Sequence, residues 1–249
     1  MSGHSKWANI KHKKAKVDAQ KGAAFAKYSK EIMIAAKAGG ANPEANFRLR
    51  TAIEKAKAAG LPNDNIKRAV EKAAGSASMD NWEEVIYEGY GPGGVAILIQ
   101  TLTDNRNRTA GDIRSYFNKN NGNLGETGCV SWIFKEEGVI SISKDTIDSD
   151  QLFELAINSG ADDFLIEESE YKIITNPESL QEVAEKIEKS EYKLKNVEIT
   201  RNPQNTIPVE DTENAKLLLR LLDSIENHDD VQNVYANFEI EDNLLEELS

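Results

Sequence analysis

The 249-residue sequence is poor in the residues that build disulfides, metal sites and nucleophilic catalytic sites. It has one cysteine, Cys129, and three histidines, His4, His12 and His228, which lie towards the two ends of the chain. One cysteine excludes an intramolecular disulfide and a cysteine-based zinc site, and it is typical of a reducing compartment. Neither a metal cluster nor a Ser–His or Cys–His pair can be assembled from so few residues. We therefore predict no metal, no cofactor and no catalytic residue.

Long apolar stretches are also missing. No segment approaches the roughly 18 consecutive apolar residues of a membrane-spanning helix. The first residues, MSGHSKWANIKHKK, have neither the apolar core of a secretory signal nor the Arg- and Ser-rich pattern of a transit peptide. These absences predict a cytoplasmic protein with no membrane partner, and we expect it to be a monomer.

The motifs of common enzyme families are absent or lie in the wrong context. The segment GYGPGG matches G-x-G-x-x-G at Gly89, Gly91 and Gly94. A dinucleotide site needs a strand before this motif and a helix after it, whereas strand-like segments flank it on both sides here. Pro92 and Gly93 instead suit the two central positions of a type II turn, so we predict a hairpin. The many acidic residues have no apolar surroundings to perturb their pKa, which favours a solvated surface over an acid–base pair and predicts a non-enzymatic protein.

Charge is distributed unevenly along the chain, whose formal net charge is -12. Residues 1–75 contain 16 Lys and Arg and 6 Asp and Glu, a net charge of +10, whereas the remainder contains 14 and 36, a net charge of -22. A basic segment on an acidic body is typical of a protein that binds a polyanion. Its lysines displace counterions from phosphates, while the acidic part restricts the docking face.

The basic charge is concentrated in Ser5–Gly22, an arm with six lysines and one acid. Its apolar residues form too narrow a stripe to hold it in place. Six phosphate contacts would lose about a thousandfold in affinity between roughly 50 and 200 mM salt, so such an arm is energetically meaningful. Trp7 and His12 add flat rings that can stack on unpaired bases, which favours RNA or single strands over duplex DNA. The alternative is an arm that packs against a protein partner.

Two further regions extend the candidate interface. Arg106 and Arg108 lie at the expected N-terminus of a helix, where N–H groups favour an anion, although a capped helix with solvent-facing arginines fits equally well. The predicted nucleic-acid-binding residues are Lys6, Trp7, Lys11, His12, Lys13, Lys14, Lys16, Lys21, Lys27, Lys30, Arg48, Arg50, Arg106 and Arg108. The Gly-rich segment after that helix predicts a mobile, exposed functional loop, with an ordinary connector as the alternative. This loop comprises Gly122, Asn123, Leu124, Gly125, Glu126, Thr127 and Gly128.

Helical periodicity dominates residues 23–75. A first helix runs from about Ala23 to Gly39, a second begins with Asn42 as its cap and Pro43 at its first position, and a third ends at Gly75. The pattern predicts a three-helix domain preceded by the basic arm.

Strand-like periodicity begins after a linker at about residue 78. Two strands joined by the GPGG turn are followed by a helix over 106–120 and by a strand in which Val130, Trp132 and Phe134 alternate. Residues 138–202 have the order β-α-β-β-α-β of a ferredoxin-like domain. The last helix and strand are too little for a domain, so we expect them to complete the unit that began at residue 83.

We therefore predict an α+β protein, in which an N-terminal three-helix domain with a basic arm precedes two α/β lobes. The predicted domains are 1–77, the arm and helices; 78–137 with 203–249, a discontinuous α+β domain; and 138–202, a ferredoxin-like domain inserted into it.

Several long segments resemble those of the YebC/PmpR family, and they extend over almost the whole chain. They are GHSKWANIKHKKAKVDAQKG, YEGYGPGGVA, TDNRNRT, GNLGETGCVSWIF and DDVQNVY. The family more often has serine where Cys129 stands, and it includes mitochondrial translational activators of cytochrome c oxidase. The resemblance implies a three-domain, non-enzymatic cytoplasmic protein that acts either as a DNA-binding transcriptional regulator or as a ribosome-associated factor that assists translation, including at proline-containing stretches.

The residues favour the second function. The polar side chains of the third helix are mainly Asn65, Lys67, Arg68 and Lys72. They do not form the row of Arg, Asn and Gln side chains with which a recognition helix contacts base edges. A Lys-rich arm with a tryptophan suits shape and phosphate recognition on structured RNA. We expect the arm and the helical domain to bind rRNA or tRNA phosphates of the ribosome, while the loop 122–128 reaches a functional centre. The alternative is a DNA-binding transcriptional regulator.

Overall fold

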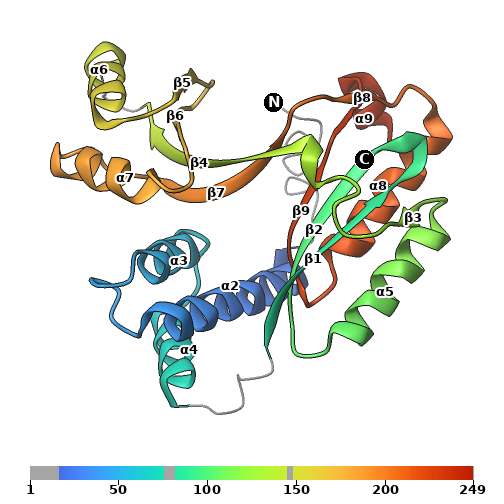
Figure 1. Cartoon of the computed structure of the whole chain (residues 1–249), viewed down its shortest axis with the longest axis horizontal. Coiled ribbons are helices and arrows are strands. Elements are labelled where there is room, and N and C mark those ends of the chain that lie inside the picture. The colour runs from blue at the N-terminus through green and yellow to red at the C-terminus, as the bar shows by residue number, and fades with distance from the viewer. Residues whose placement is uncertain (1–16, 76–81, 145–147, 249) are drawn as a thin grey trace.

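Three lobes make up the structure, a computed structural model that describes residues 17–75, 82–144 and 148–248 (Figure 1). A lobe of helices comes first, and two lobes that each contain a four-stranded sheet follow. This arrangement confirms the predicted α+β class. Residues 1–16, which hold most of the predicted arm, lie outside the described residues.

The helical lobe contains α2 (Val17–Gly39), α3 (Phe47–Ala58) and α4 (Asn63–Gly75). Its core mixes branched side chains with alanines, whose small volume lets helices approach closely. The buried residues include Ile32, Ala35, Leu49, Ala52, Ala56 and Ile66.

The second helix begins later than predicted, because its N-cap is Asn46 and not Asn42. Asn46 Oδ1 accepts a hydrogen bond from Leu49 N at 3.0 Å, and Asn46 Nδ2 donates to Ala35 O at 2.8 Å. Asn42 Oδ1 accepts from Glu44 N at 3.1 Å and so shapes the preceding turn. Both asparagines suit a cap, and the contact of Asn46 with α2 decides between them.

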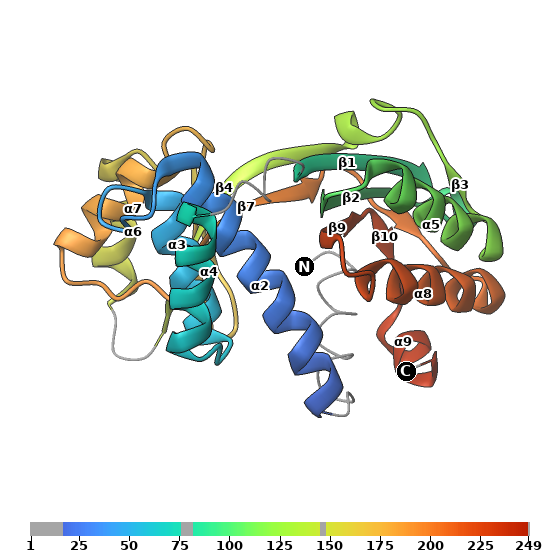
Figure 2. The same ribbon diagram turned by 90° about the horizontal axis from the view of Figure 1, so that it is seen from below.

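The middle lobe has an antiparallel sheet in the order β3-β1-β2-β9, and two helices pack side by side against one face of it (Figure 2). Because β9 follows the third lobe in the sequence, the chain leaves this sheet and later returns to it. The elements are β1 (Glu83–Tyr90), β2 (Ala96–Thr103), α5 (Arg106–Lys119), β3 (Asn123–Leu124), α8 (Thr212–Glu226) and β9 (Val231–Ala236).

The predicted type II turn joins β1 and β2. Gly94 N donates to Gly91 O at 3.2 Å, and Gly93 has φ 72 and ψ 8, the left-handed geometry that the third turn position requires. The short 3-10 helix η2 (Pro92–Gly94) is part of this turn. A strand follows the G-x-G-x-x-G motif, so the hairpin prediction is confirmed.

The third lobe has an antiparallel sheet in the order β5-β6-β4-β7, with α6 and α7 packed against one face. This is the ferredoxin-like order that the β-α-β-β-α-β pattern predicts. The elements are β4 (Phe134–Ser143), α6 (Ser149–Ser159), β5 (Asp163–Ile166), β6 (Glu170–Thr175), α7 (Leu180–Lys189) and β7 (Asn196–Pro203). The domain boundaries stay predictions, since β4 runs through residue 138 without interruption.

The predicted strand around Trp132 is wrong in part. Ser131–Ile133 forms the 3-10 helix η3, and β4 begins only at Phe134. Val130, Ile133 and Phe134 share a small core on the sheet face opposite α5 and α8, which leaves Trp132 exposed. The remaining elements are β8 (Ile207–Pro208), which pairs in parallel with β10 (Phe238–Glu239), and α9 (Asp242–Leu248).

Candidate nucleic-acid interface

The described residues include part of the predicted interface. The arm residues Lys6, Trp7, Lys11, His12, Lys13, Lys14 and Lys16 lie outside them. Lys21 belongs to α2, but its side chain is not among those described. The other predicted cations and the loop can be placed.

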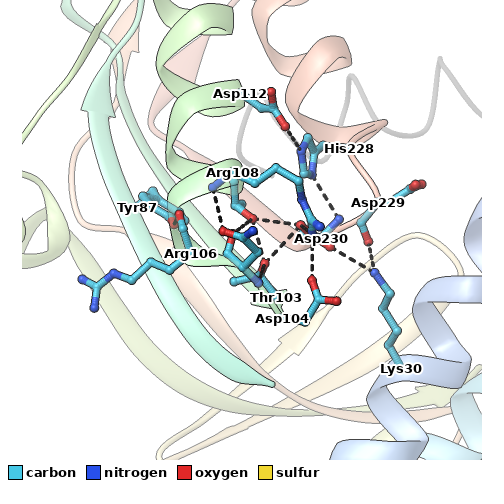
Figure 3. Close-up of polar contacts among 12 residues, drawn as sticks. Lys30, Tyr87, Thr103, Asp104, Arg106, Arg108, Asp112, His228, Asp229 and Asp230 are labelled. Atoms are coloured by element: carbon cyan, nitrogen blue, oxygen red, sulfur yellow. Dashed lines mark hydrogen bonds and ion pairs between the residues drawn. The ribbon is translucent and has the colours of Figure 1, made fainter. Parts of the chain in front are cut away.

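Arg108 belongs to a polar cluster around a buried carboxylate, that of Asp230, whose side chain is only 5% exposed. Asp230 Oδ2 accepts hydrogen bonds from Arg108 Nη2 at 2.7 Å, from Thr109 Oγ1 at 2.8 Å and from Thr103 Oγ1 at 3.2 Å (Figure 3). Asn105 caps α5 by accepting from Arg108 N at 3.1 Å, which sets the first turns of the helix beside the end of β2. The Asp230 cluster therefore joins β2, α5 and the start of β9.

The surroundings keep Asp230 ionised. Burial alone would raise the pKa of its carboxyl, but hydrogen bonds from Arg108 and Thr109 and the charge of Lys30 outweigh burial and lower the pKa from 3.8 to about 2. A carboxylate whose negative charge is balanced by neighbouring cations in this way is a structural anchor, and it is poorly suited to accept a proton near neutral pH.

Lys30 and Lys27 connect α2 to the same region. Lys30 Nζ donates to Asp229 O at 2.7 Å and to Asp230 Oδ1 at 3.3 Å, and it lies 5.0 Å from the centre of the Trp82 ring. Lys27 Nζ donates to a backbone oxygen at the end of α8 at 2.5 Å. Both lysines hold the helical lobe against the middle lobe, a role that the sequence analysis missed. Nucleic-acid binding by them stays a prediction.

Arg48 and Arg50 lie where the three lobes meet. A cleft of about 800 Å³ is lined there by α3, by β7 and by strands β1, β2 and β9. Arg48 pairs with Glu84 of β1, and Arg50 pairs with Glu185 of α7 at 3.7 Å. These arginines thus link α3 to both sheet-containing lobes, and their predicted contact with nucleic acid is untested.

Arg106, the first residue of α5, is exposed, and its side chain points away from the Asp230 cluster (Figure 3). Its backbone oxygen accepts from Tyr87 Oη at 3.0 Å, which fixes the start of α5 against β1. The sequence left open an anion site or a capped helix at this point. Asn105 is the cap, and anion binding stays a prediction.

The predicted functional loop, Gly122–Gly128, is held at both ends. Its start pairs with β1, and Gly125 N donates to Glu88 O at 2.8 Å. The carboxylate of Glu88, which is 3% exposed, accepts three backbone N–H groups, each at 2.8 Å. They belong to Gly128, Val130 and Ser131. The predicted exposure is confirmed for the tip, Glu126–Gly128, whereas these hydrogen bonds argue against the predicted mobility.

Burial would raise the pKa of the Glu88 carboxyl, but the backbone hydrogen bonds prevail and lower it below its ordinary value. Glu88 therefore stays charged and keeps all three N–H groups satisfied. No sequence signal indicates this role, because YEGY has only the pattern of a strand with one acidic residue.

Trp132 presents an aromatic surface beside the loop. The sequence analysis missed this surface. The side chain of Trp132 is 68% exposed, and its Nε1 donates to Cys129 O at 3.1 Å. The same oxygen accepts from Tyr90 Oη at 3.0 Å. Burial raises the pKa of the Cys129 thiol, which disfavours the reactive thiolate.

In the part of the chain that the structure describes, no group of three or more His, Cys, Asp or Glu side chains is arranged to hold a metal ion. His228 Nε2 instead lies 3.2 Å from Asp112 Oδ2. Among the same residues, no helix is both long and apolar enough to cross a bilayer.

Comparison with known proteins gives one consistent family. Residues 5–76 match the model of the TACO1/YebC protein N-terminal domain, and residues 82–238 match that of the TACO1/YebC second and third domain. Relatives from Natranaerobius thermophilus and Dictyoglomus turgidum are 53% and 52% identical and cover 99% and 100% of this chain and of their own. Both carry the name "Probable transcriptional regulatory protein". The crystal structure of a conserved hypothetical protein from Aquifex aeolicus, 49% identical, matches with a TM-score of 0.81 over 95% of this chain and 97% of that one.

Proposed function

This chain belongs to the TACO1/YebC family, and from that premise we propose that it regulates gene expression by binding nucleic acid, with rRNA or tRNA of the ribosome as the favoured target. Its action is binding and not bond-making. The observation that carries the proposal is the separation of charge between residues 1–75, at +10, and the remainder, at -22. Such a molecule attracts phosphates at one end and repels them elsewhere.

The contacts of the described cations limit which positive charges are left to bind phosphate. Lys30, Arg48, Arg50 and Arg108 all interact with acidic groups of the chain itself. The proposal therefore relies on the six lysines of Ser5–Gly22 for phosphate contacts, with Arg106 as an addition at the start of α5.

Two targets have to be distinguished. The rings of Trp7 and His12 in the arm, and the exposed ring of Trp132, support RNA, because unpaired bases stack on aromatic side chains. The name that both relatives carry supports the second candidate, a DNA-binding transcriptional regulator. On the RNA proposal, the arm anchors the protein on the ribosome, and the loop Gly122–Gly128 contacts a functional centre. This contact assists elongation at proline-containing sequences.

The test measures binding of the purified protein to ribosomes and to a promoter DNA fragment over a range of salt. Lys13→Ala is expected to weaken ribosome binding and to lower the salt slope by about one unit, because one phosphate contact is lost. Trp7→Ala should add a loss that is largely independent of salt, since stacking on a base releases no counterions.

The matched control is Lys216→Ala, which removes an exposed lysine of α8, outside the arm and the helical domain, and should change neither quantity. Equal salt slopes for Lys13→Ala and the control would refute binding through the arm. A preference of about a thousandfold for one duplex sequence over scrambled DNA, without ribosome binding, would replace the RNA proposal by the transcriptional regulator.

The loop has its own test. Thr127→Ala alters the exposed tip and leaves the Glu88 anchor untouched, so translation of a proline-rich reporter should fall while ribosome affinity is kept. Full activity at full binding would make the loop a connector.

A further inference from the structure

Large exposed apolar side chains gather on two neighbouring elements of the third lobe. Phe153 and Ile157 of α6 are 50% and 44% exposed, and Ile166 of β5 is 64% exposed. Single exposed apolar residues are ordinary, but a group of them on one surface marks an interaction site or an aggregation hazard.

These side chains form one surface. Phe153 and Ile157 are four residues apart and share a face of α6. The ring of Phe164 on β5 lies 5.6 Å from that of Phe153, edge to face. Phe164 and Ile166 pair with core residues of β6 that lie beneath α6 and α7, so both point to the helix side of the sheet. We name Phe153, Ile157, Phe164 and Ile166 the α6–β5 face.

The position of this face leaves it open. α6 and β5 lie at the outer end of the third lobe, away from α2 and α5 (Figure 1). In the sheet order β5-β6-β4-β7, β5 is an outer strand, and among the described residues no strand pairs with its other edge. An uncovered edge beside apolar side chains is a surface that proteins use to bind other chains.

The charge around the face selects the partner. Residues 148–170 contain no Lys or Arg and eight acids, which are Asp148, Asp150, Glu154, Asp162, Asp163, Glu167, Glu168 and Glu170. Three lysines from outside the segment contact it. Lys172 pairs with Glu167 at 3.5 Å and with Glu170 at 4.0 Å, Lys195 pairs with Glu170 at 2.7 Å, and Lys186 donates to Ser159 O at 3.2 Å, so two of the three already pair with acids of the segment. Phosphates of nucleic acid and anionic lipid are repelled here, and so is the same face of a second copy.

We propose that the α6–β5 face is a docking surface for a basic segment of another protein, one that places apolar side chains against Phe153, Ile157 and Ile166 and its Lys or Arg side chains against the surrounding acids. Apolar anchors in the centre with charge at the rim are the usual organisation of such interfaces. The residues of this face are separate in sequence from the basic arm, and none of them is among the predicted nucleic-acid-binding residues.

The experiment uses the full-length protein and a fluorescent synthetic peptide in which leucines form one face of a helix and lysines the other. We expect binding that weakens with salt and that falls about tenfold or more when Ile157→Ser and Ile166→Ser are combined. Ile199→Ser, an equally solvent-facing isoleucine on β7 at 49% exposure, is the matched control and should bind as the wild type does.

A second pair of variants tests the charge without touching the apolar side chains. Glu154→Gln with Glu168→Gln should weaken binding and reduce its salt dependence, whereas Glu210→Gln with Glu213→Gln, which changes two exposed acids outside the third lobe, should not. These charge variants keep the proposal testable if the serine variants unfold.

Three results of the peptide experiment would overturn the proposal, and two further results would replace it by another partner. The first three are no binding of the peptide, equal binding of a scrambled peptide with the same composition, and equal losses in the α6–β5 and control variants. A concentration-dependent dimer that the serine variants abolish would assign the face to a second copy instead. Loss of RNA-oligonucleotide binding in these variants would assign it to nucleic acid. Peptide binding lost with RNA binding intact supports the docking surface whether or not the proposed function is correct.

Discussion

Asp230→Asn is expected to weaken the contact between the middle lobe and α2, because it removes the charge at which Arg108 and Lys30 meet. The pKa difference between 3.8 and about 2 corresponds to roughly 2.5 kcal/mol, at about 1.4 kcal/mol per unit. The Arg108 side chain is 48% exposed, so water screens part of this interaction. We therefore expect the variant to lose about 1–2 kcal/mol of unfolding free energy at neutral pH.

The sign of the pH dependence follows from the lowered pKa. Because the carboxyl of Asp230 is more acidic in the folded protein, its stabilisation is fully present well above the unfolded pKa of 3.8 and is lost as the pH falls towards about 2. Nearly half of the effect should be gone at about pH 3. A contribution from shape or packing alone would not change over this range.

Urea unfolding of the wild type and the variant, followed by circular dichroism near neutral pH and again near pH 3, measures both quantities. Asp229→Asn is the matched control, since Asp229 is exposed and binds Lys30 through its backbone oxygen. A loss below about 0.5 kcal/mol, the size of an ordinary surface change, would refute the anchoring role. So would a difference from the wild type that is the same at both pH values.

Two further predictions concern the loop. In the wild type, three backbone N–H groups share the two carboxylate oxygens of Glu88, whereas Glu88→Gln leaves a single acceptor oxygen. We therefore expect the variant to lose about 1–3 kcal/mol of unfolding free energy and to show faster amide hydrogen exchange over residues 122–131, with exchange in α5 unchanged. Unaltered exchange over residues 122–131 would contradict the role of Glu88 in holding the loop. In Gly125→Ala the new Cβ would lie 2.5 Å from Cys129 Sγ, so the melting temperature should fall by an amount that corresponds to about 1–3 kcal/mol, and Cys129→Ala in the same chain should restore most of it. A double variant as unstable as the single one would show that the strain lies elsewhere.

Much of the fold can be predicted from the sequence because its signals are local. Pro92 and Gly93 dictate a type II turn through their own backbone preferences, and the alternation of strands and helices over 138–202 predicts the ferredoxin-like lobe. Where two local signals compete, the sequence is insufficient. Asn42 and Asn46 are equally good caps, and the hydrogen bond of Asn46 to α2 selects the second.

The candidate site divides in the same way. The sequence by itself determined the charge separation and the basic arm, because net charge depends on composition and not on how the chain packs. Only the tertiary structure decided that Lys30 meets Asp230, 200 residues away, and that Glu88 holds the backbone of Val130, 42 residues away. A lysine that pairs across two lobes and a lysine that faces solvent have the same local pattern. The partner is chosen by packing, which buries the carboxylate and makes an unpaired charge there too costly to leave.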